Sequence, residues 1–310
     1  MRILKRLIKK LVKKITSKYK TLPQIPPHPC SNCKSELAIR IDEKIIPDFK
    51  INDLISKDLS NKFSKKWNGI CMNCGLFQDF LILNPEENRK FCSELISKDI
   101  ATSDENFWKF PLDKEFIKKM ENIYWKKRIR NWEKFFSKKN IIPKNALFIR
   151  PMFGAGPEFI SNTYGAKVGG LEISEICDRT TSDRVKNYKS LNGQIHGYLE
   201  GDFLKNNNFD SIFVYHSLVH SHNLDEMLNK LKNLLTRNGF IIFSDEVTRK
   251  PSNPFHNLHF SEIIFTNILK RHFKFVYRID DCANNKDPNI INYTIKRDTP
   301  DFLVSNKKYI

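Results

Sequence analysis

The sequence has no run of about 18 uncharged apolar residues, which is the length that a helix needs to cross a bilayer. Its first residues also lack the uninterrupted apolar core of a secretory signal peptide, because lysines break every apolar pair. An odd number of cysteines, seven in 310 residues, does not suit a disulfide framework. These absences exclude a membrane-spanning helix and indicate a reducing, cytoplasmic setting, and 40% hydrophobic residues suffice for a buried core.

The formal charge of +18 is unevenly distributed along the chain. Residues 1–20 hold nine basic residues and no acidic one, so they carry half of the excess. At helical periodicity their apolar residues occupy one half of the circumference and their lysines the other. We expect a basic amphipathic helix over residues 1–22 that lies peripherally on an anionic membrane surface, at its inner face. A helix packed on the domain and an RNA-binding arm are the alternatives.

Four of the cysteines fall in two C-x-x-C pairs: Cys30 with Cys33, and Cys71 with Cys74. Each pair turns tightly enough for both sulfurs to reach one ion at about 2.3 Å, and two pairs complete a tetrahedral shell of four sulfurs. Gly75, directly after the second pair, supplies the permissive backbone that such a turn needs. The spacing predicts a structural Zn²⁺ site in a zinc-ribbon-like module over residues 23–106. Two unrelated pairs of reduced cysteines are the alternative.

Residues 107–140 form a helical stretch that is rich in aromatic and basic side chains. Aromatic residues at this density favour packing in a core or over a cofactor, and stacking on nucleic-acid bases is the alternative.

Beyond this stretch, over residues 141–310, short apolar runs alternate with amphipathic segments, which is typical of a parallel α/β domain. The expected strands are Ala146–Arg150, Ala166–Leu171, Gln194–Tyr198, Asp210–Tyr215, Phe240–Ser244, Phe273–Ile279 and Ile290–Ile295. The expected helices lie at 156–164, 174–189, 224–236 and 259–272, with Gly239 between the third helix and the next strand. The last two strands are joined by a loop, so they should pair antiparallel at one edge of the sheet.

This order of elements resembles the class I S-adenosylmethionine-dependent methyltransferases, whose doubly wound sheet has six parallel strands and an antiparallel seventh. The matching motifs are Gly154-Ala-Gly156 after the first strand, Glu172 after the second, and Gly201-Asp202-Phe203 after the third. The resemblance implies that Gly154 and Gly156 let the backbone approach the cofactor's amino-acid portion, and that Glu172 accepts the ribose hydroxyls. It also implies that Asp202, followed by Phe203, binds the adenine amino group, and that S-adenosylmethionine is the cofactor.

The loop departs from that family at Arg150 and Met152, where the family usually has an acidic residue and a first glycine. The Arg150 guanidinium cannot accept a hydrogen bond from the cofactor's ammonium group and repels its charge. With a rearranged loop it would instead pair with the cofactor's carboxylate. A methyltransferase-like fold that does not catalyse is therefore one alternative.

The second cysteine pair lies in Cys71-Met-Asn-Cys74-Gly75-Leu-Phe-Gln78, which resembles the end of the amino-terminal zinc domain of sugar C-methyltransferases and their relatives. In those relatives the zinc domain precedes a methyltransferase domain. This resemblance implies a saccharide acceptor, such as a nucleotide sugar or a surface polysaccharide.

A hydroxyl or carbon acceptor also needs a base, and histidine titrates in the suitable range. His216 and His220 follow the fourth expected strand, and His256 and His259 follow the fifth. Ligands bind at the carboxyl ends of strands in open α/β sheets. We expect His216 and His220, and then His259, to act in catalysis. A capping or packing role for each histidine and a second metal site built from them are the alternatives.

The sequence therefore predicts an S-adenosylmethionine-dependent methyltransferase (EC 2.1.1) that acts on a sugar or other small polar acceptor, in surface-polysaccharide biosynthesis. The alternatives are a tRNA or rRNA methyltransferase and a non-catalytic binding protein. The charge distribution weighs against nucleic acid, because residues 141–310 hold 22 basic and 18 acidic residues and so lack a strongly basic surface.

Overall fold

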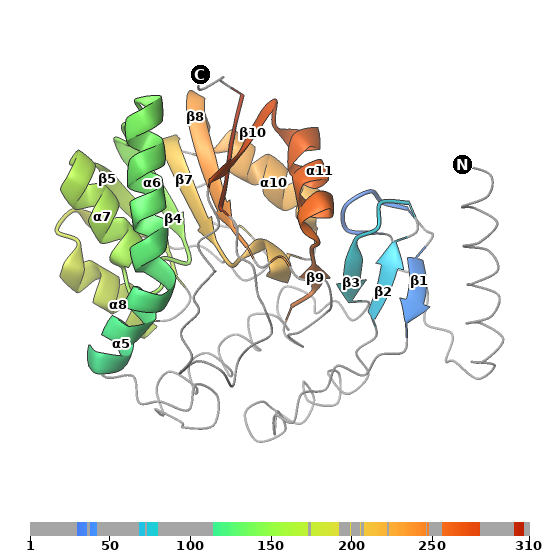
Figure 1. The fold of residues 1–310 in the computed structure, drawn as a ribbon, viewed down its shortest axis with the longest axis horizontal. Helices are drawn as coiled ribbons and strands as arrows, with labels where there is room; N and C mark the ends of the chain where they lie inside the picture. The colour runs from blue at the N-terminus through green and yellow to red at the C-terminus, as the bar shows by residue number, and fades with distance from the viewer. Residues whose placement is uncertain are drawn as a thin grey trace.

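The structure is a computed structural model with two β-sheets and helices on both faces of the larger sheet (Figure 1). It describes residues 30–35, 38–41, 68–71, 73–79, 114–172, 175–191, 199, 205, 208–221, 223–245, 247, 256–279 and 301–306.

Seven strands form the larger sheet, in the order β10-β11-β8-β7-β4-β5-β6. Their bounds are β4 (Asn145–Ile149), β5 (Lys167–Leu171), β6 (Tyr188–Ser190), β7 (Phe209–Tyr215), β8 (Leu235–Ser244), β10 (Phe275–Ile279) and β11 (Asp301–Ser305). Strand β11 pairs antiparallel with both β10 and β8, and the other neighbouring strands pair parallel. Six strands thus share one direction and one opposes them, which confirms the predicted fold class.

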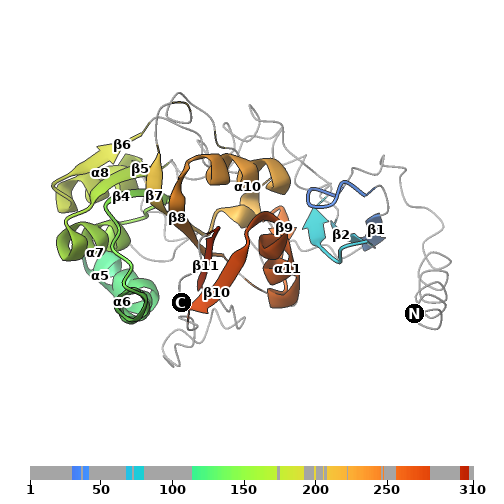
Figure 2. The same ribbon diagram turned by 90° about the horizontal axis from the view of Figure 1, so that it is seen from above.

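Helices make this sheet the middle of three layers (Figure 2). One side carries α5 (Lys114–Met120), the π-helical turn η1 (Glu121–Trp125), α6 (Lys126–Lys139) and α7 (Ala155–Tyr164), with α8 (Glu175–Arg184) packed against α7. The other side carries α10 (Leu224–Asn233) and α11 (Glu262–His272). The short 3-10 turn η2 (Leu218–His220) follows β7.

Side chains of the central strands alternate between two buried clusters, one under each helix layer. Phe148 of β4 and Phe213 of β7 belong to the cluster that contains the α6 aromatics, and their rings stack 4.4 Å apart. Leu147 and Ile212, one residue earlier, belong to the cluster under α10 and α11. The period of two explains why these strands read as continuous apolar runs, since both faces of the sheet are covered.

Helix α6 places its aromatic side chains in the core. This agrees with the prediction that they pack in a core or over a cofactor, and not with stacking on nucleic-acid bases. Trp132 and Phe136 are buried against the sheet. Arg128 is buried with them, and its Nε lies 2.9 Å from Oδ1 of Asp301 in β11. Trp132 Nε1 donates to the other oxygen of Asp301 at 2.8 Å. No sequence motif predicts this buried ion pair, because 173 residues separate its partners.

The edge strand after α8 differs from the prediction. The helix expected over 174–189 ends at Arg184, and Tyr188–Ser190 then forms β6, which pairs with β5 in the place expected for 194–198. This strand has no apolar run, since its middle residue is a lysine, so its sequence carries no strand pattern. Residues 194–198 themselves lie outside the described residues.

The antiparallel strand is Asp301–Ser305, not 290–295, which lie outside the described residues. Every residue of β11 is buried between β8 and β10, so the short run Phe302–Val304 is a complete core strand. Gly239 lies inside β8 and does not precede it. A Cβ atom there would come within 3.0 Å of the Asp210 carbonyl oxygen, so a close strand contact is what requires glycine.

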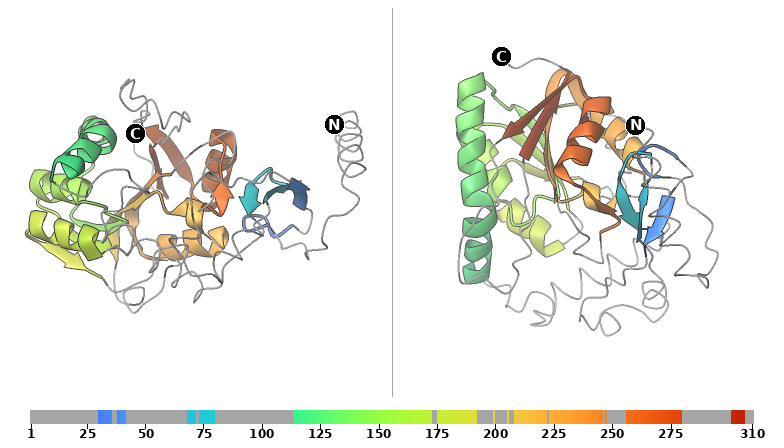
Figure 3. Two further views of the ribbon diagram at one scale, coloured as in Figure 1. Left: turned by 90° about the horizontal axis from the view of Figure 1, so that it is seen from below. Right: turned by 45° about the vertical axis from the view of Figure 1, so that its right-hand side comes forward.

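A smaller antiparallel sheet contains β1 (Ala38–Ile41), β2 (Asn68–Cys71), β3 (Phe77–Asp79) and β9 (Leu258–His259), in this order. It lies on the α11 side of the larger sheet (Figure 3). Strand β9 belongs to the chain between β8 and α11, so the carboxy-terminal half supplies one strand to the amino-terminal module.

The amphipathic helix expected over residues 1–22 lies outside the described residues, as do parts of the expected divisions 23–106 and 107–140. Among the helices that the structure describes, none is long and apolar enough to span a bilayer.

Candidate active site

Four adjacent parallel strands of the larger sheet each end in a polar residue. Glu172 follows β5, Arg150 follows β4, His216 follows β7 and Asp245 follows β8. Because parallel strands have their carboxyl ends at one edge, these residues lie along a single rim. This is the edge at which open α/β sheets bind ligands.

The rim contains three non-glycine residues with left-handed backbone: Arg150 (φ 62°), Met152 (φ 56°) and His216 (φ 47°). This region of the backbone map is costly for residues with a Cβ atom, and such residues concentrate at functional sites. Arg150 and Met152 are the two departures from the expected glycine-rich loop. The loop therefore adopts its sharp turn without the first glycine.

The two remaining glycines of the loop have different surroundings. Gly154 is the N-cap of α7 with φ 86°, and a Cβ atom there would lie 3.0 Å from the Thr181 backbone. Gly156 lies in the first turn of α7, where a Cβ atom would come within 2.6 Å of the Trp125 ring. Gly156 thus allows η1 to pack on α7, a role that the sequence prediction did not include. The expected approach of both glycines to a cofactor remains a prediction.

Glu172 lies beside this loop and is half-buried. Its Oε2 accepts the Met152 backbone N–H at 3.1 Å. A carboxylate has several acceptor positions, so this bond leaves capacity for the two hydroxyls of a ribose. The Glu172 carboxylate therefore fits the ribose of S-adenosylmethionine. Asp202 and Phe203, predicted at the adenine, lie outside the described residues.

Arg184 of α8 connects the loop to two helices, a role that the sequence did not indicate. Its guanidinium donates to the Phe153 carbonyl oxygen at 3.0 Å and pairs with both Glu121 of η1 and Glu158 of α7. One side chain therefore fixes the position of the loop relative to the helices around it. Glycine spacing cannot reveal such a contact, because Arg184 stands in an otherwise unremarked polar helix.

Tyr188 packs against the strand that leads to Glu172. A Cβ atom at Gly170 would come within 2.0 Å of the Tyr188 hydroxyl, which in turn donates to Asp178 Oδ1 at 2.6 Å. Burial, together with this hydrogen bond, raises the pKa of the Tyr188 phenol. Gly170 therefore makes room for a neutral tyrosine next to the predicted ribose site.

Three histidines meet at the other half of the rim: His216, His220 and His256. Ring centroids lie 4.8 Å apart for His216 and His256, 5.0 Å for His220 and His256, and 6.0 Å for His216 and His220. His220 and His256 are buried, and His216 is partly exposed. The structure thus joins His256 to the two histidines that were expected to act first.

Arg150 directs its side chain toward these histidines. Its Nη1 donates to the His216 carbonyl oxygen at 2.9 Å and lies 3.3 Å from His220 Nε2. The guanidinium thus contacts the histidine half of the rim, and its pairing with a cofactor carboxylate in a rearranged loop remains a prediction.

Asp245 holds the turn that carries two of the histidines. It is fully buried, and its carboxylate accepts the backbone N–H groups of Leu218 and Val219, each at 3.2 Å. Burial raises the pKa of Asp245 to about 6, although His216 and these N–H groups favour the charged form. The residue after β8 therefore fixes the chain after β7.

His259 does not join the three-histidine cluster as closely. It lies on β9, where its ring packs edge-on against Phe77 of β3 with centroids 5.5 Å apart. Its centroid is 6.1 Å from that of His256. A catalytic role for His259 remains a prediction, and the structure gives this side chain a packing contact with the smaller sheet.

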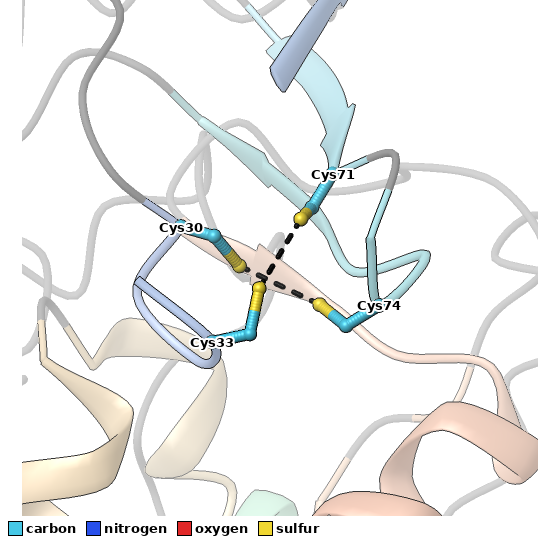
Figure 4. A group of neighbouring side chains, drawn as sticks. All are labelled: Cys30, Cys33, Cys71 and Cys74. Atoms are coloured by element: carbon cyan, nitrogen blue, oxygen red, sulfur yellow. Dashed lines mark hydrogen bonds between the residues drawn. The ribbon is translucent and has the colours of Figure 1, made fainter. Parts of the chain in front are cut away.

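The four paired cysteines converge on one point (Figure 4). Sγ of Cys30 lies 3.5 Å from Sγ of Cys74, and Sγ of Cys33 lies 3.5 Å from Sγ of Cys71. The separations are far longer than a disulfide, and four sulfurs at about 2.3 Å from Zn²⁺ lie roughly 3.8 Å apart. The arrangement therefore fits a tetrahedral thiolate site.

The two cysteine turns share one backbone pattern. The Cys30 carbonyl accepts the Lys34 N–H at 2.9 Å, and the Cys71 carbonyl accepts the Gly75 N–H at 2.7 Å. Lys34 and Gly75 also share positive φ, at 58° and 75°. The hydrogen bond between Cys30 and Cys74 lowers the pKa of Cys74 to about 4 and raises the pKa of Cys30, so Cys74 is the member of this pair that favours the thiolate, the form that binds metal.

The cysteine cluster is docked on the larger domain. Lys34 Nζ donates to Asn223 Oδ1 at 2.7 Å, and Arg271 of α11 donates to Asn32. Strand β9 adds to β3 and leads back to the histidines, because Asn257 Nδ2 donates to the His220 carbonyl at 2.8 Å. The two clusters are therefore connected through β9.

Comparison with known proteins identifies part of the chain. Residues 153–243 match the family model described as "Methyltransferase domain". A putative uroporphyrinogen-III synthase of Methanocaldococcus jannaschii is 30% identical over 128 residues, which cover 41% of this chain and 49% of that protein. The chain thus spans about half the length of that curated relative.

Solved structures are similar at low sequence identity. The plantazolicin methyltransferase BpumL in complex with SAH is 14% identical, covers 70% of this chain and 100% of its own, and has a TM-score of 0.45. The YcgJ protein from Bacillus subtilis is 10% identical, with 58% and 99% covered and a TM-score of 0.41. A SAM-dependent methyltransferase from Thiobacillus denitrificans, solved with S-adenosyl-L-homocysteine, is 10% identical, with 56% and 89% covered and a TM-score of 0.42.

The matched residues begin in the glycine-containing loop and end in β8, so they contain Gly154, Gly156, Glu172 and two of the three clustered histidines. The sheet around them has the six parallel strands and the one antiparallel strand that the sequence predicted. Within the α/β part of this chain, residues 153–243 are therefore similar to a methyltransferase domain.

Proposed function

We propose that this protein transfers the methyl group of S-adenosylmethionine to a sugar or another small polar acceptor, in a pathway that builds surface polysaccharide. The observation that carries the proposal is the rim itself. Glu172 and the glycine-containing loop occupy one half of it, and three histidines occupy the adjoining half.

The half of the rim that contains Glu172 and the loop suits the ribose of S-adenosylmethionine. Glu172 would accept the ribose hydroxyls, while its bond to Met152 N–H fixes the carboxylate next to the loop. Arg184 holds the loop through the Phe153 carbonyl, so little ordering is left for cofactor binding. When bound, the cofactor supplies an electrophilic methyl group on a sulfonium, and the protein's task is to align the acceptor with it.

The histidine half supplies groups that accept protons. His216 is the partly exposed member of the cluster, so it is the histidine best placed to contact an acceptor. Its backbone is held by the Ser244 carbonyl, which accepts the His216 N–H at 2.8 Å. A hydroxyl acceptor would pass its proton to this imidazole as the methyl group is transferred.

The cysteine cluster has a structural role in this proposal. Cys30 and Cys71 are fully buried, and none of the described rim residues belongs to the cluster. Four sulfur ligands fill a tetrahedral Zn²⁺ shell and leave no open position for a substrate. We therefore propose that zinc holds the two turns together and so supports the sheet that continues into β9.

Cofactor binding is tested by calorimetric titration of the full chain with S-adenosylhomocysteine. We expect binding by the wild type and a loss of at least about tenfold in affinity for Glu172→Ala, because one charged acceptor is removed. Glu262→Gln is the matched control, since Glu262 is exposed on α11 and pairs only with Arg278 among the ion pairs described. A folded wild type that does not bind contradicts the proposal.

The acceptor is tested by transfer of a labelled methyl group from S-adenosylmethionine to a panel of nucleotide sugars. We expect a labelled sugar product with the wild type and a strongly reduced kcat with His216→Gln. A labelled tRNA in place of a labelled sugar would instead favour the RNA-methylating alternative.

A further inference from the structure

We infer that His216, His220 and His256 form a binding site for a divalent transition-metal ion, separate from the cysteine cluster. One ring nitrogen from each of the three lies within 4.8 Å of the others. The inference does not rest on the proposed acceptor, and it excludes the proton-accepting role of His216 while the ion is bound, because the ion occupies the imidazole lone pair that would take the proton.

The mutual placement of the rings matches a shared ligand point. An ion at about 2.0–2.1 Å from each nitrogen of a tetrahedral site places the ring centroids roughly 5 Å apart. The observed centroid distances are 4.8, 5.0 and 6.0 Å, with interplanar angles of 77°, 88° and 82°. The rings are therefore mutually steep and do not stack, and a shift of about 1 Å closes the set on one ion.

The surrounding chain holds these histidines in place. Asp245 accepts two N–H groups of the η2 turn between His216 and His220. Asn257, next to His256, donates to the His220 carbonyl and gives its backbone N–H to the Val219 carbonyl at 2.8 Å. Such supporting contacts fix the orientation of metal ligands in proteins.

The ligand set selects the kind of ion. Imidazole nitrogens suit Zn²⁺, Co²⁺, Ni²⁺ and Cu²⁺, whereas Mg²⁺ and Ca²⁺ require oxygen ligands. Three protein ligands leave one position of a tetrahedral ion open, as in zinc sites that bind a substrate. The three-histidine site thus differs in kind from the closed four-sulfur site.

Arg150 is the group that opposes the ion. Its Nη1 lies 3.3 Å from His220 Nε2, within hydrogen-bond distance of that ring nitrogen. The guanidinium therefore places a positive charge beside the site. Binding of a cation through this nitrogen requires the Arg150 side chain to withdraw. Removal of the guanidinium should therefore strengthen ion binding.

The test is a Co²⁺ titration of the full chain whose cysteine cluster has first been loaded with one equivalent of Zn²⁺. Cobalt bound by imidazoles gives visible d–d bands without the thiolate charge-transfer band of a cysteine site. We expect one equivalent of such cobalt in the wild type. For His256→Ala we expect a loss beyond the roughly 10–100-fold that removal of an outer partner costs. For Arg150→Met we expect about tenfold tighter binding.

His259→Ala is the matched control, because its ring is the next closest to His256 yet packs on Phe77. We expect its cobalt affinity to equal that of the wild type. No imidazole-bound cobalt in the wild type, or an equal loss in His256→Ala and His259→Ala, overturns the inference. Circular dichroism confirms that each variant is folded. Binding of S-adenosylhomocysteine is measured separately, so failure of the cofactor proposal is distinguished from failure of the metal site.

Discussion

The cysteine cluster and the histidine cluster both bring three or more metal-ligating side chains together, but they are assembled in opposite ways. Each cysteine pair is closed by its own turn, with the Lys34 or Gly75 N–H bonded to the carbonyl of the first cysteine. The histidines come from the end of β7, the η2 turn and the segment before β9, and the contacts of Asp245 and Asn257 join these elements. Local sequence thus encodes the first cluster, whereas the sheet assembles the second.

The histidine cluster is expected to depend on the cysteine cluster, but the cysteine cluster is not expected to depend on the histidines. The smaller sheet ends in β9, whose neighbours Asn257 and His256 take part in the histidine cluster. We therefore expect loss of the cysteine site to disturb the histidines through β9. Loss of a histidine leaves the cysteine turns with all of their own hydrogen bonds.

The largest effect is expected when the cysteine cluster is broken. Cys71→Ser removes one sulfur ligand, and we expect loss of bound zinc with a fall of about 4 kcal/mol or more in the free energy of unfolding. Guanidinium unfolding and elemental analysis measure the two quantities. We also expect weaker cobalt binding at the histidines, because β9 loses its support.

Cys177→Ala is the control for this substitution, since Cys177 is buried in α8 far from the paired cysteines in sequence. It should keep one equivalent of zinc and lose only about 1 kcal/mol. A Cys71→Ser protein that keeps both its zinc and its stability would show that the cluster does not support the fold.

A break in the larger sheet, outside both clusters, is expected to have the next largest effect. Asp301→Asn leaves the buried Arg128 guanidinium without its carboxylate, which typically costs about 3–5 kcal/mol. Since this pair lies between α6 and β11, we expect destabilisation of the larger sheet while zinc remains bound at the cysteines. Chemical unfolding and elemental analysis again report both. Zinc loss on substitution of Asp301 would contradict the independence of the cysteine turns.

These contrasts explain which parts of the fold could be predicted from the sequence alone. Spacing revealed the C-x-x-C pairs, and short apolar runs revealed β4, β5 and β7, because both signals lie within a few residues. The Arg128–Asp301 pair and the addition of β9 to β3 join segments separated by more than 170 residues, so no local pattern contains them. Strand β6 was missed for a different reason, since a polar edge strand has no apolar periodicity.

The candidate site divides along the same line. Glu172 stands directly after β5 and Gly154 stands in the loop after β4, so both could be predicted from order and spacing. The membership of His256 in the cluster, and the packing of His259 on Phe77, depend on where β9 turns. Arg184 and its contact with the Phe153 carbonyl are equally tertiary. The sequence was enough to locate the rim, but tertiary contacts decide which residues belong to it.

The two cysteine turns can be compared with each other at the position of positive φ. Gly75→Ala places a Cβ atom in left-handed backbone, 3.3 Å from Ile264 Cδ1, and we expect a loss of about 1–2 kcal/mol. Lys34→Gly relieves the same backbone cost but loses the exposed bond to Asn223, so we expect a net change below about 0.5 kcal/mol. Thermal unfolding of both zinc-loaded variants tests this contrast. If Lys34→Gly lost as much stability as Gly75→Ala, the first turn would depend on its lysine side chain, and the two turns would not be equivalent.

The smallest effect is expected where the cysteine module meets α10. Glu226 accepts a hydrogen bond from Lys230, which holds the pKa of this carboxyl below its usual range, and Lys34 of the first cysteine turn contributes attraction. A lowered carboxyl pKa stabilises the folded protein at pH values above about 4.3, and the contribution is lost as the pH falls through the folded-state value. Because Glu226 is 51% exposed, we expect Glu226→Gln to cost no more than about 0.5 kcal/mol at neutral pH.

This difference should vanish in acid, where Glu226 is protonated in both the folded and the unfolded protein. Urea unfolding of the wild type and Glu226→Gln across the acid range measures it, and high salt should reduce it at neutral pH. A difference that persists unchanged in acid would assign the effect to the Asn223 hydrogen bond with Glu226 instead of to charge. In that case the contact between the cysteine module and α10 would depend on hydrogen-bond geometry, as the histidine cluster does, and the contrast between the two clusters would not extend to the surface that joins them.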